Sequence, residues 1–599
     1  MDDQAKRLQA LRGLMREHGL AAYLVPHADQ HQNEYLTPGD ERLAWISGFD
    51  GSAGLAIVCL ESAALFVDGR YTLQVQDQAS PDFWQHLHLT DNPAELWLQR
   101  QLKAGDTVGF DPRLHTPGGL ARLRTVLENS DIKLAAIGNN LIDQVWADRP
   151  AQANAPVVIY DQAFSGENSS AKRQRMADHL TEDGLDALVV SAPDNLSWLF
   201  NVRGADVEMT PSVFGYVILK SDASAVLFID GAKLSAEVRA EINAQGAGAV
   251  TILEPDCLDD ELSKLNGQKV RVDSSTANVF VVEALKTAGA KVDMGADPCT
   301  LAKACKNLVE LQGIRNAHLR DGVALARFFN WFSTAAPGID TEWSAAQKVD
   351  GFRAEGEHFR SLSFPTISGF GENAAHVHYK VAKATARTLG NDELYLVDSG
   401  AQYLDGTTDV TRVLVTGTPT PEMRQRYTQV LKGHIQVLRA RFPEGTTGAQ
   451  IDPLARQFLW AAGVDYDHGT GHGVGCYLSV HEGPQSISKR GKDVALQPGM
   501  VMSVEPGYYK AGAFGIRIEN LVAVRVLDPQ PQGAERRTLG FEALTLAPYE
   551  RRLIEVSELS GAERAWLDEY HAHVRLMLTP KLNADAAAYL GQQTAPLTA

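Results

Sequence analysis

Residues 398–412 read DSGAQYLDGTTDVTR, and this stretch places Asp398 and Asp409 on two β-like runs joined by a short connection. Asp405-Gly406 within the connection is typical of the tight turns that join antiparallel strands. The midpoint between the two aspartates falls inside this connection, so a hairpin would place their carboxylates roughly opposite each other. The stretch therefore predicts a hairpin that carries a pair of acids.

A second stretch, residues 505–519 (EPGYYKAGAFGIRIE), repeats the arrangement with two glutamates. Glu505 and Glu519 flank the loop KAGAFG, and their midpoint is Gly512. A second hairpin would again bring two carboxylates close together. We therefore expect the domain that contains both stretches to combine antiparallel hairpins with packed helices, as in an α+β fold.

The four carboxylates of these two hairpins predict a cation site. Like charges at close range raise one another's pKa values, so four unpaired carboxylates would be unfavourable. Two divalent cations would remove that repulsion, and each carboxylate has two oxygens with which to bridge them. A single acid in a strand is more often a solvated edge residue, but two mirrored hairpins argue against that interpretation.

A histidine completes the expected ligand set. His472 lies in HGTGHGVG (468–475), where glycine occupies every second position. Because side chains alternate along a strand, this spacing predicts a face without side chains, on which metal and substrate can approach the backbone. A phosphate-binding loop is the competing interpretation, but the segment contains neither GKS/T nor GxGxxG.

Oxygen-rich donors with one imidazole and no thiolate favour Mn²⁺, with Co²⁺ or Zn²⁺ as alternatives, over a structural zinc site. Two close cations with a bridging hydroxide are suited to hydrolysis, because the metals lower the pKa of water and polarise the scissile carbonyl. The sequence therefore predicts a hydrolase with two divalent metal ions.

Three further histidines accompany these segments: His378 in HVHYK, His468 four residues before the histidine ligand, and His481 in SVHEGP. We expect them to stabilise the transition state or to transfer protons. His376 and His358 are interpreted as ordinary structural or surface histidines.

The composition is that of a soluble globular protein, with 44% hydrophobic and 22% charged residues. A formal net charge of -18 argues against nucleic acid or an anionic membrane as the main partner. Five scattered cysteines without a CxxC pair fit a reducing compartment. Because neither a signal peptide nor an apolar run of membrane-spanning length is found, we expect a cytoplasmic protein.

The 599 residues suggest a multidomain chain, at roughly 150 residues per domain. Residues 1–154 and 155–306 each begin with a helix, Gly-Leu, an apolar strand and a polar loop, which predicts two copies of one α/β unit. Residues 307–599 carry all the expected metal ligands and end in a helical extension. Within them we expect a helix over residues 422–442.

Longer segments of the chain resemble aminopeptidase P (Xaa-Pro aminopeptidase), a metallopeptidase with the pita-bread fold. In the C-terminal part the resemblance rests on DSGAQYLDGTTDVTR, HGTGHGVG, VHEGP, EPGYY and GIRIEN. SGFDGSAG, DGRY, NVRGADVE, SFPTISG, VLKGHI and WLDEYH extend it over nearly the whole chain. The resemblance implies the long form of this enzyme, with two creatinase-like N-terminal α/β domains before a pita-bread catalytic domain.

Carried over position by position, the resemblance implies the roles of ten residues. Five would bind the metals, with Asp409 and Glu519 bridging them: Asp398, Asp409, His472, Glu505 and Glu519. Glu505 would also accept the proton of the attacking water. His378, His468 and His481 would face the substrate, and Tyr509 and Arg517 would lie near it. A homodimer is implied by the resemblance alone.

The activity implied is release of the N-terminal residue from short peptides with proline at the second position. An Xaa-Pro bond is a tertiary amide without an N–H, so general peptidases fit it poorly. Prolidase, which cleaves Xaa-Pro dipeptides, and the shorter methionine aminopeptidase share the metal ligands and remain alternatives. Non-catalytic pita-bread binding proteins are a further alternative, but those usually lack ligands that this chain retains.

Overall fold

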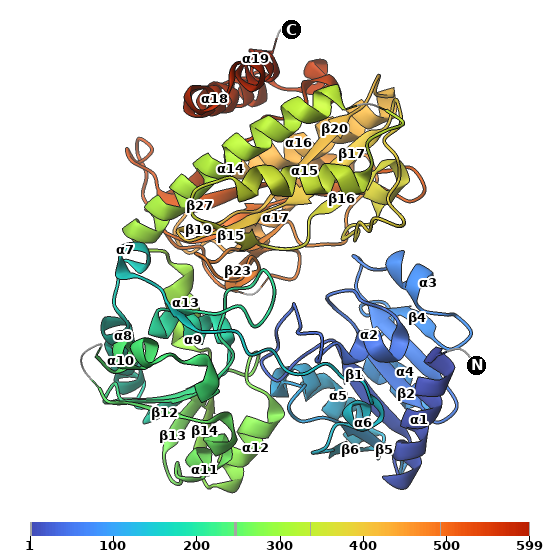
Figure 1. The fold of residues 1–599 in the computed structure, drawn as a ribbon, viewed down its shortest axis with the longest axis vertical. Helices are drawn as coiled ribbons and strands as arrows, with labels where there is room; N and C mark the ends of the chain where they lie inside the picture. The colour runs from blue at the N-terminus through green and yellow to red at the C-terminus, as the bar shows by residue number, and fades with distance from the viewer. Residues whose placement is uncertain (1–2, 245–247, 336, 492, 598–599) are drawn as a thin grey trace. The chain divides into compact units, whose positions relative to one another are not determined.

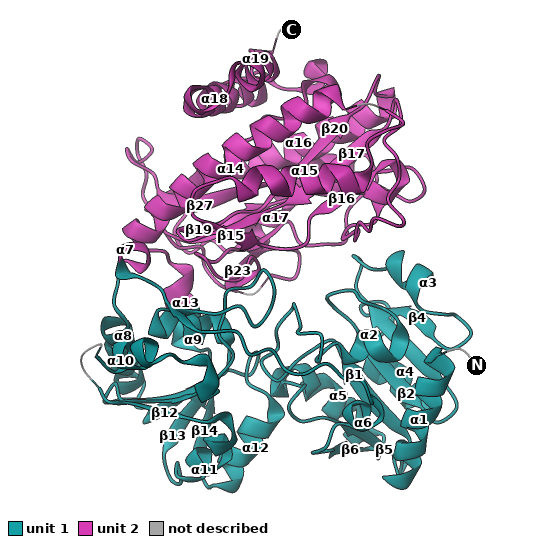
Figure 2. Cartoon of the chain, viewed as in Figure 1, with its two compact units in different colours: residues 1–162, 167–300 teal, residues 163–166, 301–599 magenta. Residues whose placement is uncertain are grey.

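The chain divides after residue 300 into two compact units (Figure 1 and Figure 2). The computed structural model describes residues 3–244, 248–335, 337–491 and 493–597. Unit 1 comprises residues 1–162 and 167–300, and unit 2 comprises 163–166 and 301–599. Within the described ranges, no helix combines the length and apolar character needed to span a bilayer. The predicted boundaries at 154/155 and 306/307 stay a prediction.

The first half of unit 1 is a six-stranded mixed sheet flanked by helices. Its strands are β1 (Ala22–Pro26), β2 (Leu55–Cys59), β3 (Ala63–Val67), β4 (Gln85–His88), β5 (Thr107–Phe110) and β6 (Lys133–Ala136), in the order β4-β3-β2-β1-β5-β6. Its helices are α1 (Asp3–Glu17), α2 (Arg42–Ser47), α3 (Gln74–Gln78), α4 (Ala94–Gln101), α5 (Pro117–Asn129) and α6 (Leu141–Val145). Along β1, Tyr23 and Val25 pack in one core with α1, whereas Ala22 and Leu24 pack in the core on the opposite face.

The second half of unit 1 repeats this topology. Its strands are β8 (Ala187–Val190), β10 (Tyr216–Lys220), β11 (Ala225–Phe228), β12 (Val250–Leu253), β13 (Lys269–Val272) and β14 (Lys291–Met294), in the order β12-β11-β10-β8-β13-β14. β8 pairs antiparallel with β10 and parallel with β13, as β1 pairs with β2 and β5. The main helices are α8 (Ser169–Glu182), α9 (Pro193–Phe200), α10 (Ala236–Ala244), α11 (Leu258–Ser263), α12 (Val279–Thr287) and α13 (Pro298–Ala304). Matching strand order and pairing support the predicted duplication.

Unit 2 begins with two helices whose ends follow from capping. In α14 (Leu308–Thr334), Asn307 and Glu310 form a capping box, and in α15 (Glu342–Ala354) the N-cap is Thr341. The later helices are α16 (Pro421–Leu438), α17 (Gly448–Ala461), α18 (Gly561–Leu578) and α19 (Ala584–Gln593). The prediction that α16 continues to residue 442 is wrong. The chain turns there into β21 (Arg441–Pro443), because Pro443 disfavours helix at the residue before it.

The described residues of unit 2 form three antiparallel sheets and a separate hairpin. The strands are β15 (Phe359–Leu362), β16 (Ile367–Phe370), β17 (Leu394–Ser399), β18 (Ala401–Tyr403), β19 (Gly406–Thr407), β20 (Val410–Val415), β22 (Gly471–Gly473), β23 (Glu482–Ile487), β24 (Val501–Val504), β25 (Gly507–Lys510), β26 (Phe514–Arg517), β27 (Asn520–Val526) and β28 (Thr538–Ala543). The sheets run β16-β17-β20, β15-β18-β19 and β21-β28-β27-β24-β22-β23, and β25 pairs with β26.

The first predicted hairpin is present. β17 pairs antiparallel with β20, with Asp398 opposite Thr411, and the tip is the turn between β18 and β19. Asp409 comes two residues before Thr411 and is therefore on the same face as Asp398, displaced diagonally. A Cβ on Gly400 would overlap the carbonyl of Thr408, so this close approach requires glycine.

The second predicted hairpin is also present and is longer than the loop pattern indicates. Val504 of β24 pairs with Asn520 of β27, and Gly507 of β25 pairs with Arg517 of β26. Both pairs share one register, which places Glu505 opposite Glu519 at the junction of the two ladders. Gly512 has a φ of +70° in the loop, a conformation that glycine adopts without strain.

Candidate metal centre

The predicted ligands in unit 2 lie on or directly beside five strands, β17, β20, β22, β24 and β27. One ligand atom each from Asp409, His472 and Glu519 lie within 4.8 Å of one another. His472 Nε2 lies 3.5 Å from Asp409 Oδ2 and 3.5 Å from Glu505 Oε1. These separations suit donors that share a cation.

Asp398 supplies the most direct observation in favour of a bound cation. Its Oδ2 accepts a hydrogen bond of 2.6 Å from Arg517 Nη2. Its Oδ1 is buried and accepts no hydrogen bond from the described residues. A buried carboxylate oxygen without a donor is costly, and a metal ion would satisfy it.

The pKa values of the clustered carboxyl groups also favour a bound cation. Burial, together with the neighbouring carboxylates, raises the pKa of Asp409 and of Glu519 well above the usual range. Burial raises the pKa of Glu505 to about 7, although Arg517 opposes that shift. The cluster is therefore short of positive charge, which two divalent cations would provide.

His472 is held in the tautomer that a metal ligand needs. Its Nδ1 lies 2.9 Å from the carbonyl of Gly473, so Nδ1 carries the proton and Nε2 presents a lone pair to Asp409 and Glu505. The Oγ of Ser503 accepts from the His472 N–H at 3.0 Å and lies 3.3 Å from Glu505 Oε1.

The interpretation of the alternating glycines as a bare face is wrong at the two glycines of β22. A Cβ on Gly471 would overlap the carbonyl of Ser503 in β24, and a Cβ on Gly473 would overlap the carbonyl of Glu482 in β23. The neighbouring backbone occupies the space that a side chain would need. Glycine there lets three strands approach closely around His472.

A hydrogen-bonded chain links the cluster to His468. Arg517 Nη1 donates to Tyr509 Oη at 2.7 Å, and that hydroxyl donates to His468 Nε2 at 2.8 Å. His468 Nδ1 donates to the Gly469 carbonyl at 2.7 Å, which fixes the ring tautomer. Since Arg517 also contacts Asp398, the predicted substrate-side residues are continuous with the predicted ligands.

Nine of the ten predicted site residues belong to this one network. The ring of His481 meets that of His472 edge-on, with centroids 4.3 Å apart and an interplanar angle of 79°. The joined residues are Asp398, Asp409, His468, His472, His481, Glu505, Tyr509, Arg517 and Glu519.

His378 lies on a separate segment of the chain, before β17. It is half-buried and follows the 3-10 turn η3 (Gly371–Ala375) by three residues. That turn packs on β26, because a Cβ on Gly515 would overlap the carbonyl of Ala374. The segment before His378 thus contacts the strand of Arg517, and its role stays a prediction.

Two residues that support the site, Thr411 and Ser503, are not predicted from the sequence. Thr411 Oγ1 accepts from Arg517 Nε at 3.2 Å and donates to Glu519 Oε2 at 2.9 Å, and it thereby connects these two residues. Ser503 supports His472 and Glu505 in the same way. The only sequence signal is position, since Thr411 follows Asp409 by two residues and Ser503 precedes Glu505 by two.

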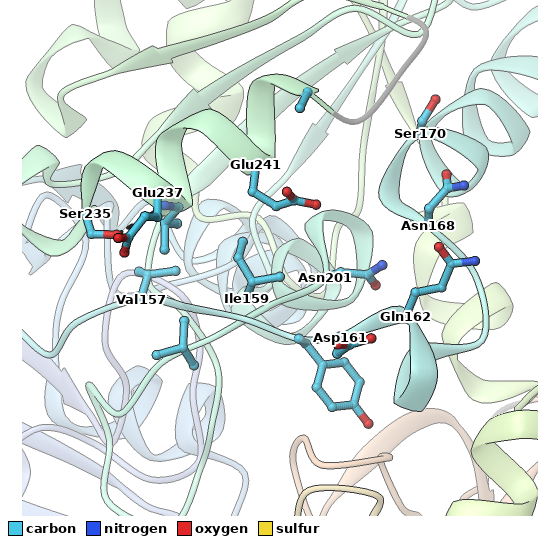
Figure 3. A pocket seen from close by; sticks show the side chains of 14 residues that line it. Val157, Ile159, Asp161, Gln162, Asn168, Ser170, Asn201, Ser235, Glu237 and Glu241 are labelled. Carbon is cyan, nitrogen blue, oxygen red and sulfur yellow. Dashed lines mark hydrogen bonds between the residues drawn. The ribbon is translucent and has the colours of Figure 1, made fainter.

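A large pocket in unit 1 is unrelated to this centre. It has a volume of about 1020 Å³ and lies beside α10, with Asp161, Glu237 and Glu241 among its polar groups (Figure 3). None of the ten predicted site residues lines it. Its acidic side chains are exposed, so it provides no counterpart to the buried cluster.

The sequence matches families of known peptidases along its length. Residues 312–525 match metallopeptidase family M24, and residues 537–597 match the C-terminal region of that peptidase. Residues 7–145 and 148–310 each match a creatinase/prolidase N-terminal domain. These matches agree with the predicted fold class of two creatinase-like domains before a pita-bread catalytic domain.

Individual relatives cover almost the whole chain. A probable Xaa-Pro aminopeptidase P of Neurospora crassa is 41% identical, with 98% of this chain and 89% of the relative covered. One from Aspergillus fumigatus is 40% identical, with 99% and 93% covered. The crystal structure of an X-prolyl aminopeptidase from Caenorhabditis elegans, described as a cytosolic enzyme with a di-nuclear active site, superposes with a TM-score of 0.94. The two sequences are 33% identical, and the match covers 99% of this chain and 100% of the C. elegans chain.

An Xaa-Pro dipeptidase from Bacillus anthracis shares the fold alone. It covers 64% of this chain at 23% identity, with a TM-score of 0.51. The three aminopeptidases above are thus matched over nearly the whole chain, whereas this dipeptidase is matched over 64% of it. The chain belongs to the Xaa-Pro aminopeptidase P family of M24 metallopeptidases.

Proposed function

We propose that this protein is a metal-dependent aminopeptidase that releases the N-terminal residue from peptides with proline at the second position. The observation that carries the proposal is the convergence of four carboxylates and His472 around a buried oxygen of Asp398 that accepts no hydrogen bond from the described residues. The specificity for Xaa-Pro comes from the relatives, which are named for it.

Five side chains would hold two divalent cations: Asp398, Asp409, His472, Glu505 and Glu519. Cations bound there would lower the pKa of a water molecule and polarise the scissile carbonyl. The oxygen-rich donor set favours Mn²⁺ as the native metal, with Zn²⁺ and Co²⁺ as alternatives.

Glu505 is the proposed proton acceptor for the attacking water. Its carboxylate is oriented by Ser503 and lies beside His472 Nε2, where it can accept a proton from a water molecule in the cluster. His481 stands edge-on to His472, where it can donate a hydrogen bond to the oxygen that gains charge in the transition state.

His378 and His468 are proposed to contact the substrate. His468 Nε2 accepts a hydrogen bond from the Tyr509 hydroxyl, which in turn accepts one from Arg517, so the chain that reaches Asp398 also orients the His468 ring. The substrates are short peptides rather than nucleic acid or membrane, consistent with the net charge of -18.

We also propose that the enzyme is cytoplasmic and forms a homodimer, with Mn²⁺ bound. The described cysteines are all free thiols, and the C. elegans relative is described as cytosolic. The homodimer rests on the family resemblance alone, and sedimentation of the purified protein tests it.

Three peptides separate the competing functions in one assay. The protein should hydrolyse Ala-Pro-Ala much faster than the dipeptide Ala-Pro or the peptide Met-Ala-Ser. Preference for Ala-Pro would identify a prolidase, and preference for Met-Ala-Ser a methionine aminopeptidase. Failure to hydrolyse any of them after incubation with Mn²⁺ would favour a non-catalytic binding protein.

A further inference from the structure

The residue after His481 has its side chain in a buried ionic cluster that the proposed mechanism does not use. Glu482 opens β23, and its backbone pairs with Gly473, the residue next to the ligand His472. His481 is the residue immediately before this strand, and its ring packs edge-on against that of His472. Whatever holds the Glu482 side chain therefore also sets where the ring of His481 lies.

Two lysines hold that side chain. Lys303 Nζ lies 2.7 Å from Glu482 Oε2, and Lys306 Nζ contacts Glu482 Oε1. All three side chains are buried, with exposed fractions of 2%, 1% and 0% for Lys303, Lys306 and Glu482. Lysine and glutamate are almost never fully buried without a partner, so each charge in this cluster depends on the others.

The lysines belong to residues 303–306 of unit 2, and this segment also contacts the backbone just before β24. The N–H of Lys306 donates to the Gly499 carbonyl at 3.1 Å, and Cys305 forms an isolated antiparallel bridge with Met500. A Cβ on Gly499 would lie 2.7 Å from the Lys306 carbonyl, so the approach is close. β24 follows directly and ends next to Glu505.

We propose that Lys303, Lys306 and Glu482 are positioning residues that hold His481 against His472 from behind the metal centre. The segment 303–306 then links the backbone before Glu505 to the strand after His481, and so fixes the spacing between the proposed general base and the proposed oxyanion donor. This inference rests on the proposed function. None of the three touches the reacting atoms, and they act through His481.

Glu482→Gln tests the inference in the metal-loaded enzyme. With the Ala-Pro-Ala substrate we expect kcat to fall by about 10- to 100-fold, up to the lower end of the roughly 10²- to 10⁴-fold that a positioned acid–base group contributes, while KM and the bound metal change little. Glu563→Gln is the matched control, because Glu563 is also a buried glutamate near a lysine, Lys432, but lies at the start of α18. This control should keep the parental kcat.

Two further variants separate positioning from folding and from direct catalysis. Replacing all three residues by methionine removes the buried charges together, which proteins tolerate better than an unpaired ion. This variant should fold and bind metal, yet show the same loss of kcat. In a protein that already carries His481→Ala, Glu482→Gln should lower kcat almost no further, because both substitutions impair the same role of His481.

The outcomes are distinct. Full kcat in both Glu482 variants, or losses that multiply with that of His481→Ala, would overturn the positioning role. A crystal structure of the triple-methionine variant with the His481 ring still at 4.3 Å from that of His472 would also contradict it. An inactive parent enzyme would instead refute the proposed function.

Discussion

Raising the pH should destabilise the metal-free protein through Glu505, and the size of the effect follows from the structure. Burial raises the pKa of this carboxyl from 4.5 to about 7. The folded state therefore binds more protons than the unfolded state between these values, and stability falls as pH rises through that window. At about 1.4 kcal/mol per pKa unit, the cost above pH 7 is about 3 kcal/mol.

Glu505→Gln isolates this cost, because buried histidines titrate in the same window with the opposite sign. Burial lowers the pKa of His115 to about 4 and that of His571 to about 3, so their contribution to stability grows as pH rises above those values. These contributions are shared by parent and variant, and they cancel when the two proteins are compared at the same pH.

The assay is urea unfolding of chelator-treated parent and Glu505→Gln proteins at pH 5, 6, 7 and 8. The two should be about equally stable at pH 5, and the variant should be more stable by about 3 kcal/mol at pH 8. Added Mn²⁺ should reverse the order at pH 8 by stabilising only the parent. A variant that is no more stable than the metal-free parent at pH 8 would refute the account of the cluster as short of positive charge.

Three other substitutions test separate parts of the site. His481→Ala should lower kcat by about 100-fold with metal content unchanged, and loss of metal would identify it as a ligand instead. Tyr509→Phe should lower the free energy of unfolding by about 1–3 kcal/mol, because the buried Arg517 Nη1 loses its acceptor. The variant should also hydrolyse the substrate more slowly. Unchanged stability would argue against the hydrogen-bonded chain. Gly471→Ala should weaken Mn²⁺ binding measured by calorimetry, because a Cβ there would overlap the Ser503 carbonyl and displace the strand that carries His472. Unchanged affinity would contradict that packing.

The two hairpins were predictable because their information is local. Asp405-Gly406 and the loop around Gly512 determine where the chain reverses, and the positions of the acids relative to each turn then determine that they meet. The order of α/β elements similarly indicated two repeated domains, which the matching sheet topologies of unit 1 bear out.

The contacts behind the site were not predictable, because they join segments far apart in sequence. Nothing near Glu482 indicates that Lys303 and Lys306 meet it, since that contact depends on how the segment before α14 packs on β23 and β24. The alternating glycines predict a bare face, but the pattern of one strand does not show how close its neighbours lie. The end of α16 is different, because Pro443 is a local signal against helix at residue 442.

The count of bound metal ions tests the central claim most directly. Chelator-treated protein should be titrated with Mn²⁺ while heat release and hydrolysis of Ala-Pro-Ala are followed in parallel. The account predicts two ions per chain, activity that returns as they bind, and loss of both in Asp409→Asn, which removes a proposed bridging ligand. Full hydrolysis in the metal-free protein, or an Asp409→Asn variant that still binds two ions and retains activity, would contradict it.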